Sequence, residues 1–466
     1  MQNKLTNADV EQLVKEHQQF FYTKATRSLD FRLQQLLKLK GKIKEYEEQI
    51  IAALQKDLGK HPFESYTTEI GFVLSSITYT MKHLKKWTKQ KKVKTPFTLF
   101  PAKSYIRYEP LGTILIIGPF NYPFQLVVEP LIGAIAAGNG AVIKPSEMTP
   151  SVSAVITKII QATFDSAYIR SIEGGVSATA ALLEGKFDYI FFTGSERVGK
   201  IVMEAAAKNL TPITLELGGK SPAIVDETAD IAIAAQRIIW GKTVNAGQTC
   251  VAPDYVVVHE TVKDQLIQEM KLTLHSFYGD SLKTKEDFGR IVNDKHFLRL
   301  QNILQREQEN KTIIHGGITH ENSRFIGPTL IHGKWDSPSM EEEIFGPILP
   351  IITYTDIHKV PASINEFSKP LALYLFTADA KVEETILDEI SSGGVSINDT
   401  ITHLANPELP FGGVGHSGMG AYHGKYSFFT FSHQRSVLKK SNRINTTILQ
   451  PPYTEKKLNI IRKLLK

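Results

Sequence analysis

The sequence contains a single cysteine, Cys250, among its 466 residues. One thiol excludes an internal disulfide framework and any metal or iron–sulfur site that needs several cysteines from one chain. The sequence also lacks a run of about 18 to 20 apolar residues, which a membrane helix requires, and residues 1–30 lack the apolar core of a secretory signal. We therefore expect a cytoplasmic protein without a metal centre or an integral membrane anchor.

Positive charge is concentrated in two segments. The formal net charge is +6, but residues 82–94 hold seven lysines and no acid, and residues 433–466 hold nine basic residues and one acid. Trp87 and Tyr453 are the only aromatic residues among these charges, too few for a nucleic-acid stacking platform. We expect solvated basic surfaces and no nucleic-acid partner.

The composition and length indicate a folded protein with two large lobes. Hydrophobic residues make up 42% and charged residues 22% of the chain, close to the globular average. The chain has 466 residues and a mass of 52.1 kDa. This length exceeds the roughly 250 to 300 residues at which a single hydrophobic core stops growing. More than one hydrophobic core is therefore expected.

Hydrophobic periodicity predicts an α/β fold. Residues 4–60 have helical spacing. From Thr113 onward, short apolar runs alternate with amphipathic stretches, which is typical of a parallel sheet with helices on its faces. The segments of the first block are 113–117, 126–137, 141–143, 152–164, 189–192 and 198–208. Those of a second block are 213–225, 231–240, 255–258, 348–354 and 371–376.

Two further segments, 97–109 and 426–449, alternate polar and apolar residues with a period near two. This pattern predicts strands that stand apart from both lobes, with Phe428, Phe429 and Phe431 among their aromatic residues. The basic end of the chain, 457–466, includes Ile460, Ile461, Leu464 and Leu465 and predicts a surface helix rather than an anchor.

Two glycine-rich segments imitate nucleotide-binding motifs. Residues 194–200 match the P-loop pattern up to its lysine. The next residue, Ile201, has no hydroxyl to bind magnesium, and Glu196 would place a carboxylate among the phosphate oxygens. Gly413, Gly415 and Gly418 fit the dinucleotide fingerprint by letter, yet no strand leads directly into them. We interpret this second segment as a loop in which the backbone comes close to another part of the protein.

Three segments carry residues suited to catalysis. Cys250 lies between a glycine and a proline in Asn245–Pro253, a turn that could present sulfur to a cleft, although a lone cysteine is usually a small buried residue. Glu216 ends an apolar run, where burial would raise its pKa toward that of a general base, although a capping glutamate is commoner. Asn121 lies in a turn held by two prolines, and its side-chain amide could donate to an oxyanion. An asparagine in such a turn more often only stabilises the turn.

Together these segments resemble the aldehyde dehydrogenase family over nearly the whole chain. The cysteine segment and the segment Leu215-Glu-Leu-Gly-Gly-Lys-Ser-Pro222 match the family's two active-site patterns in order and spacing. Further matching segments are 144–147, 192–195, 343–347 and 409–415. The resemblance implies a Rossmann-type cofactor domain, an α/β catalytic domain and a small β oligomerisation element.

The resemblance also assigns roles to residues. Cys250 would attack an aldehyde, Asn121 would hold the oxyanion, and Glu216 would activate the water that hydrolyses the thioester to a carboxylic acid. The thiol would be acidified by backbone dipoles and by the positive ring of the cofactor. Tyr122 and His403 are expected in the substrate tunnel. The residues expected to bind NAD, with NADP possible, are Lys144 and Glu147 at the adenosine ribose, Gly194 and Ser195 at the pyrophosphate, and Glu343 and Phe345 at the nicotinamide ribose.

Domain boundaries and assembly follow from the same resemblance. Residues 1–96 and 110–215 would form the NAD(P)-binding domain and 216–400 the catalytic domain. Residues 401–425 would return to the cofactor domain, 97–109 and 426–449 would bridge subunits, and 450–466 would form a tail. The chain is similar to the class 3 and fatty-aldehyde members, which implies a homodimer acting on medium- or long-chain aliphatic or aromatic aldehydes.

Three alternatives remain at this point. An acylating enzyme that passes the thioester to coenzyme A would not need Glu216 as a hydrolytic base. A nucleoside-triphosphatase is disfavoured by Ile201. A non-catalytic NAD-binding protein would most simply have lost the thiol or the carboxylate, and both are present.

Overall fold

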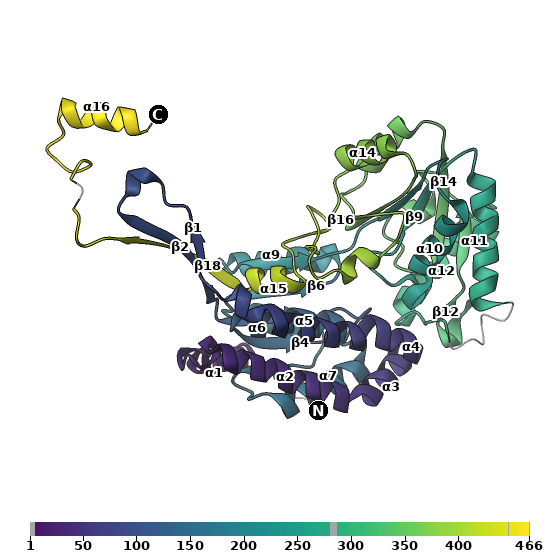
Figure 1. The fold of residues 1–466 in the computed structure, drawn as a ribbon. Helices are drawn as coiled ribbons and strands as arrows, with labels where there is room; N and C mark the ends of the chain where they lie inside the picture. The colour runs from purple at the N-terminus through teal and green to yellow at the C-terminus, as the bar shows by residue number, and fades with distance from the viewer. Residues whose placement is uncertain (1–4, 280–286, 446, 466) are drawn as a thin grey trace.

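The computed structural model describes residues 5–279, 287–445 and 447–465, and two large sheets form the body of the molecule (Figure 1). The first sheet has five parallel strands and one short antiparallel edge strand. Its order is β17 (Gly418–Met419), β7 (Ile213–Glu216), β6 (Tyr189–Thr193), β3 (Thr113–Ile117), β4 (Gly140–Lys144) and β5 (Ile169–Ser171).

Helices cover both faces of this sheet because its central strands are apolar on both sides. All five residues of β3, of β4 and of β6 are buried. One face packs with α1 (Asn7–Tyr22), α8 (Val176–Leu183) and α9 (Glu196–Ala207). The other face packs with α2 (Leu29–Glu45), α3 (Glu47–Leu58), α5 (Gly71–Trp87), α6 (Gln125–Ala137) and α7 (Pro150–Thr163).

The second sheet is parallel except for its edge strand β10. Its order is β10 (Ile313–His315), β13 (Thr329–His332), β14 (Ile348–Tyr354), β9 (Tyr255–His259), β8 (Pro222–Val225), β15 (Ala372–Phe376) and β16 (Gly394–Ile397). Its helices are α10 (Ile231–Thr243), α11 (Lys263–Tyr278), α12 (Asp294–Glu309), α13 (Val360–Asn365) and α14 (Ala380–Glu389). A two-stranded ribbon joins β11 (Thr319–His320) to β12 (Phe325–Ile326).

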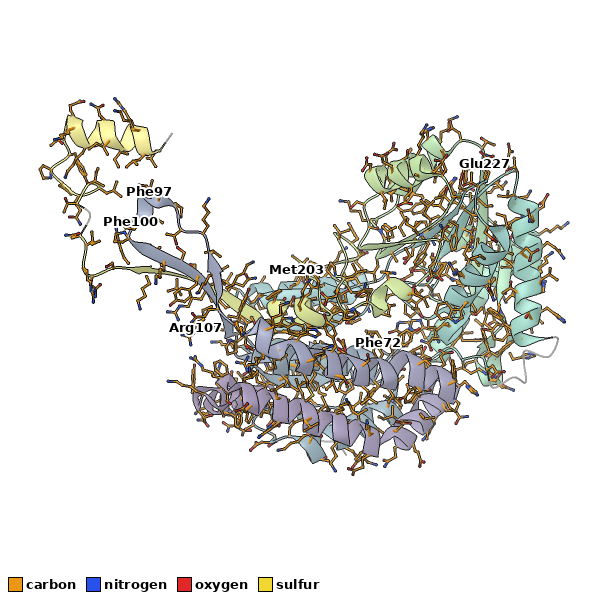
Figure 2. The ribbon with its side chains drawn as sticks, in the orientation of Figure 1. Phe72, Phe97, Phe100, Arg107, Met203 and Glu227 are labelled. Carbon is orange, nitrogen blue, oxygen red and sulfur yellow. The ribbon has the colours of Figure 1, made fainter. Side chains whose placement is uncertain are left out.

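A three-stranded antiparallel sheet, here named the arm, projects from the body (Figure 1). It consists of β1 (Lys91–Val93), β2 (Ala102–Pro110) and β18 (Ser432–Lys440), and β18 pairs with β2 along all nine residues. Exposed Phe97 and Phe100 lie near its far end (Figure 2). Beyond it lies α16 (Glu455–Leu464), in which no residue is buried.

The local predictions agree with the structure at most elements and differ at four. The expected helix over residues 4–60 is three helices, and Ile213, expected in the second block, begins a strand of the first sheet. The strands expected over residues 97–109 and 426–449 are too long. Phe97–Leu99 is a 3-10 helix, Gly424–Thr430 forms helix α15, and β18 ends at Lys440. Phe428 of α15 and Phe431, which follows it, are buried, and the helix packs on α5 and α6. A short aromatic run does not by itself distinguish a helix from a strand.

Candidate active site

Cys250 lies in a tight turn after α10. Asn245, Ala246 and Gly247 have φ angles of 53°, 52° and 74°, and this left-handed backbone reverses the chain just before the cysteine. A Cβ added at Gly247 would lie 2.4 Å from the carbonyl oxygen of Gly346. Glycine therefore lets the cysteine turn approach the Glu343–Gly346 segment, with Cys250 itself half-buried and free.

Hydrogen bonds join the cysteine turn to the turn that carries Asn121. The Asn245 Nδ2 group donates to the Asn121 carbonyl oxygen at 2.7 Å and to that of Gln248 at 3.1 Å. The hydroxyls of Tyr122 and Thr249 lie 2.7 Å apart. Asn121 is buried, and among the described residues no hydrogen bond engages its side-chain amide. The amide is therefore available to another oxygen.

Glu216 is the last residue of β7 and faces the same region. Its side chain is buried, and neither carboxylate oxygen has a hydrogen-bond partner within the described chain. Burial alone raises the pKa of Glu216 well above its usual value, because the charged form loses its hydration. The glycine-rich loop explains the close packing here, since Gly418 pairs directly with Glu216 in the sheet.

The Cys250 thiol is a weak acid in the protein without ligands. Burial, together with the nearby carboxylates of Glu343 and Glu216, raises its pKa to about 12, against a lowering by the backbone N–H groups of Cys250 and Val251. The two carboxylates therefore lie within electrostatic reach of the sulfur. No histidine among the described residues contributes to this balance, so the arrangement is unlike a cysteine–histidine pair.

Aromatic side chains from strand β15 and from the late loop, residues 401–425, lie in this region. The Tyr374 hydroxyl donates to the carbonyl oxygen of Val251. Burial, together with the charges of Glu216 and Cys250, raises the pKa of Tyr422. The Tyr422 ring packs against that of Phe411 with the ring centroids 5.7 Å apart. Tyr374 and Tyr422 were not predicted as active-site residues, because no local sequence pattern distinguishes an active-site tyrosine from a tyrosine of the core.

The two residues expected in the substrate tunnel differ in position. Tyr122 is tied to Thr249, next to Cys250. His403 packs against Tyr374 and Phe411 at ring distances of 6.2 Å, and its Nδ1 lies 3.1 Å from Ser396 Oγ. Burial lowers the pKa of His403 to about 4, so its ring is neutral at pH 7. Tyr122 thus bonds to the neighbour of Cys250, whereas His403 contacts Tyr374, whose hydroxyl bonds to Val251.

The expected adenosine and pyrophosphate residues follow strands β4 and β6. Lys144, the last residue of β4, is buried and ion-paired with the exposed Glu147. Ser195 caps α9 without a side-chain hydrogen bond to its first turn, which leaves free helix N–H groups of the kind that bind phosphate. Lys200, the lysine of the P-loop-like motif, instead forms an ion pair with Glu196 at 2.7 Å on the exposed side of α9.

Glu343 and Phe345, expected at the nicotinamide ribose, lie on the segment before β14. A Cβ at Gly218 would lie 2.0 Å from Glu343 Oε2, so glycine at 218 makes room for this carboxylate. Burial and the neighbouring Asp254 raise the pKa of Glu343 to about 8, while the Gly219 N–H lowers it. Phe345 has a φ of 50° and its ring packs edge-on against Phe120 at 5.7 Å.

A buried ion pair holds the Glu343 segment in place. Lys220 Nζ lies 2.5 Å from Asp254 Oδ2 and also donates to the carbonyl oxygens of Ser339 and Glu342. The other Asp254 oxygen accepts the Ile344 N–H at 2.9 Å. No role was predicted for Lys220, which belongs to the Leu215–Pro222 motif, because its partners lie 34 and more positions away in the sequence.

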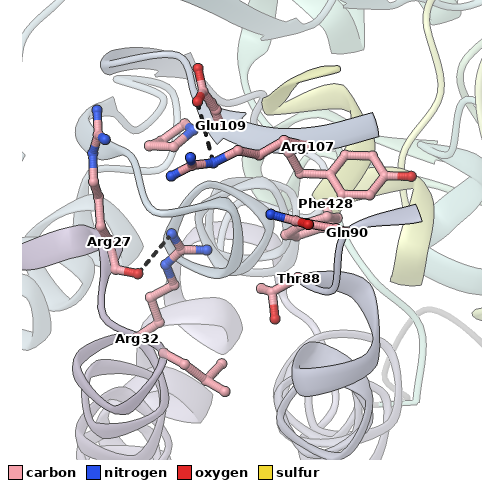
Figure 3. A pocket seen from close by; sticks show the side chains of 10 residues that line it. Arg27, Arg32, Thr88, Gln90, Arg107, Glu109 and Phe428 are labelled. Carbon is pink, nitrogen blue, oxygen red and sulfur yellow. Dashed lines mark hydrogen bonds and ion pairs between the residues drawn. The ribbon is translucent and has the colours of Figure 1, made fainter. Parts of the chain in front are cut away.

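A separate cavity of about 380 Å³ lies where the arm leaves the body (Figure 3). Arg27, Arg32 and Arg107 line it, and none of Cys250, Glu216 and Asn121 does. The Arg32 guanidinium donates to the carbonyl oxygens of Thr26 and Ala136. This arginine therefore ties α2 to the carboxyl end of α6, which is a structural role.

The described residues contain neither a helix that could span a membrane nor a cluster of metal ligands. None of the described helices combines the length and apolar character needed to cross a bilayer. Over the same residues, no three His, Cys, Asp or Glu side chains gather as metal ligands.

Comparison with known proteins identifies the family. The model of the aldehyde dehydrogenase family matches residues 2–437. The 4,4'-diaponeurosporen-aldehyde dehydrogenase of Staphylococcus aureus (strain NCTC 8325 / PS 47) is 56% identical over 448 residues, which are 96% of this chain and 97% of that protein. The dimeric NADP-preferring aldehyde dehydrogenase of Rattus norvegicus is 46% identical over 435 residues, covering 93% and 95%.

A solved structure agrees with this assignment. The substrate-bound state of Staphylococcus aureus AldH superposes with a TM-score of 0.96 at 55% identity, covering 98% of this chain and 99% of that one. The resemblance inferred from the motifs, including the aldehyde dehydrogenase fold and enzyme class, is confirmed. The chain belongs to the aldehyde dehydrogenase family.

Proposed function

We propose that this protein oxidises medium- or long-chain aliphatic or aromatic aldehydes to carboxylic acids with NAD or NADP. One observation carries the proposal: a single region holds the only thiol of the sequence, a buried carboxyl without hydrogen-bond partners among the described residues, and an amide on a turn bonded to the cysteine turn. This set provides a nucleophile, a base and an oxyanion donor, which the two-step oxidation of an aldehyde requires.

In the first step, the Cys250 thiol loses its proton to solvent, its sulfur bonds to the aldehyde carbon, and the carbonyl oxygen becomes an oxyanion. The Asn121 amide and the Cys250 N–H donate hydrogen bonds to that oxyanion. Each such donor is worth about 3 to 4 kcal/mol of transition-state stabilisation. When bound, the oxidised nicotinamide supplies positive charge near the thiol and accepts the hydride that leaves the substrate carbon.

In the second step, Glu216 takes a proton from water as the water attacks the Cys250 thioester. The carbon–sulfur bond breaks, the carboxylic acid leaves and the thiol is restored. Because burial raises the pKa of Glu216, this carboxylate is a stronger base than an exposed glutamate. The same burial keeps Glu216 protonated at low pH, so the hydrolysis rate should rise with pH.

The residues present fit a dinucleotide. The uncapped first turn of α9 suits the pyrophosphate, Lys144 and Glu147 suit the adenosine ribose, and Glu343 with Phe345 suits the nicotinamide ribose. The Glu147 carboxylate should accept hydrogen bonds from a 2′-hydroxyl and repel a 2′-phosphate, which favours NAD. The ion pair with Lys144 offsets part of that repulsion, and the rat relative is named NADP-preferring, so NADP remains a second cofactor.

Assembly and domain roles are further parts of the proposal. The arm would pair with a second subunit to form a homodimer, a state that the rat relative's name also describes. A monomer in light scattering at micromolar concentration would contradict this. The first sheet would bind the cofactor and the second would carry the cysteine. The cytoplasmic location stays a prediction.

An aldehyde panel tests the activity. Purified protein is mixed with NAD or NADP and with aldehydes from acetaldehyde to decanal plus benzaldehyde, and the absorbance of reduced cofactor is followed. We expect turnover that favours the longer or aromatic aldehydes and its loss in Cys250→Ser, which keeps the side-chain size. Cofactor binding to a folded Cys250→Ser protein is the control. A folded, cofactor-binding wild type that oxidises no aldehyde would refute the proposal.

Transfer of the acyl group to coenzyme A is the second candidate. Retention of Glu216 next to the thiol favours hydrolysis instead. Adding coenzyme A to the same assay separates the two, because an acylating enzyme would turn over only in its presence. A protein that binds NAD without turnover under either condition would fit the non-catalytic alternative.

A further inference from the structure

Lys60 and Glu69 form a buried ion pair beside the active site. Lys60 follows the end of α3, and its Nζ lies 2.5 Å from Glu69 Oε1, with both side chains fully buried. Taking two charges out of water costs several kcal/mol per ion, and such a pair is often no more stabilising than apolar residues of similar size. Stability alone is therefore a weak reason for this pair.

Each member of the pair contacts a different end of the turn that carries Asn121. Lys60 Nζ donates to the Asn121 carbonyl oxygen at 3.2 Å and lies 4.2 Å above the ring of Tyr122. Glu69 Oε2 accepts the backbone N–H groups of Phe124 and Gln125 at 2.9 and 3.1 Å. One ion pair thus fixes the backbone from Asn121 to the first turn of α6.

The Asn121 carbonyl oxygen receives a second donor from the opposite side. Asn245 Nδ2 bonds this oxygen at 2.7 Å and also bonds the Gln248 carbonyl, two residues before Cys250. The Asn121 peptide is therefore fixed between Lys60 and the cysteine turn. Because the peptide is fixed, the direction of the Asn121 Cα–Cβ bond relative to Cys250 is fixed as well.

We propose that Lys60 and Glu69 are positioning residues that set the Asn121 amide for the oxyanion formed on Cys250. This inference rests on the proposed function, because it needs Asn121 to act as the oxyanion donor. Oxyanion stabilisation depends on donors held at hydrogen-bond distance from the developing charge. A displacement of about 1 Å far from the reacting atoms can cost about 10²-fold in rate.

The most informative variant removes both charges together. Lys60→Met alone or Glu69→Gln alone would leave one buried charge without its partner, which destabilises a protein strongly. The double variant Lys60→Met/Glu69→Gln removes both charges of the pair, and the glutamine oxygen can still accept the Phe124 and Gln125 N–H groups. The neighbouring Glu64 loses the Lys60 charge and should become protonated, because burial already raises its pKa. The double variant should fold, but it lacks the hydrogen bond from Lys60 to Asn121.

The test is the rate of the reduced-cofactor burst in a stopped-flow experiment with saturating aldehyde. We expect the double variant to slow the burst about 10- to 10²-fold, with cofactor affinity and iodoacetamide alkylation of Cys250 within about twofold of wild type. Alkylation needs an intact cysteine turn but no oxyanion donor. Lys42→Met, which removes an exposed ion pair with Glu45 on α2, should leave the burst unchanged.

A comparison with Asn121→Ala separates positioning from a general structural role. If the pair acts through Asn121, adding the double substitution to Asn121→Ala should slow the burst no more than about twofold further, because effects through one group are not additive. Independent, multiplicative slowing would overturn the inference, as would an unchanged burst in the folded double variant.

Two further outcomes are informative. If the double variant does not fold, Glu69→Asp is tested in the same cycle, because it keeps both charges and only shortens the side chain that reaches Lys60 and the Phe124 and Gln125 N–H groups; the criterion of non-additivity is the same. A wild type without an aldehyde-dependent burst would overturn the proposed function and the pair's role together. A normal wild-type burst that the folded double variant retains would overturn the pair's role alone.

Discussion

The active-site region and the arm leave different kinds of groups unsatisfied. In the active site, Glu216 is buried and neither of its oxygens has a hydrogen-bond partner among the described residues. In the arm, Phe97 and Phe100 are 77% and 58% exposed, and β18 has a partner on one side only. Unpartnered polar groups thus occur where we propose that substrate binds, and uncovered apolar groups occur where we propose that a second subunit binds.

The two regions also differ in how they are held. Buried ion pairs, Lys60–Glu69 and Lys220–Asp254, fix the turns around the active site. The arm is held mainly by the long pairing of β18 with β2. Side chains that must be placed to a fraction of an ångström need support from several directions, whereas a strand edge needs only its backbone to pair.

The largest expected effect is on the active-site side, in Glu216→Gln. Without a base, thioester hydrolysis should slow about 10²- to 10⁴-fold, while the first turnover remains. Stopped-flow should therefore show a burst of about one reduced cofactor per subunit followed by a stalled steady state. In the wild type the steady-state rate should rise with pH toward the raised pKa of Glu216, and in the variant it should not. Loss of the burst itself would contradict the role of base.

The second effect concerns the stability cost of buried carboxyls near the active site. Glu129 on α6 accepts a hydrogen bond from Ser76 at 2.7 Å, its other oxygen has no partner among the described residues, and burial raises its pKa from 4.5 to about 7. Between these two pH values the folded state binds more protons than the unfolded state, so the free energy of unfolding falls as pH rises.

Glu129→Gln should remove this part of the pH dependence. The raised pKa of Glu129 corresponds to about 3 kcal/mol of stability between these pH values. Urea unfolding at about pH 5 and about pH 8 should show a smaller loss of stability in the variant than in the wild type. Glu48→Gln, on the exposed face of α3, is the matched control. Equal losses in Glu129→Gln and the wild type would contradict the prediction.

A smaller effect is expected from Gly218→Ala. The new methyl group would overlap Glu343, so the carboxylate should be displaced from its proposed position at the nicotinamide ribose. We expect the Michaelis constant for NAD to rise about tenfold, the loss of roughly one hydrogen bond to a charged group, with the melting temperature little changed.

Gly41→Ala is the control for that substitution. Nothing lies within 4 Å of a Cβ at this position of α2, so the kinetic constants should stay the same. Helix propensity should stabilise this control by up to about 1 kcal/mol. An unchanged Michaelis constant in Gly218→Ala would show that Glu343 does not contact the cofactor.

The smallest effect on chemistry is expected in the arm. Val437→Pro removes a backbone N–H from β18 and restricts its φ angle, which should weaken the proposed subunit pairing. We expect sedimentation or light scattering to shift toward monomer while the burst rate stays within about twofold of wild type. A burst that falls together with the assembly would show that the arm also supports the active site.

The sequence predicted elements wherever a local pattern sufficed. The strands at Thr113–Ile117 and Tyr189–Phe192 and the helix from Leu126 are found within a residue or two of their expected bounds, because apolar runs and periodicity act over a few neighbouring residues. The pattern failed for residues 426–430, which lie in helix α15. Packing of Phe428 and Phe431 against distant helices decided that segment.

The sequence by itself therefore determined the family, the two α/β blocks and the candidate thiol, carboxyl and amide, since these follow from residue type and order along the chain. The tertiary structure alone decided what surrounds them. Lys60 meets the carbonyl oxygen of Asn121 across 61 positions, and Tyr374 meets that of Val251 across 123. Contacts between residues so far apart form only when the sheets pack, and no local pattern encodes them.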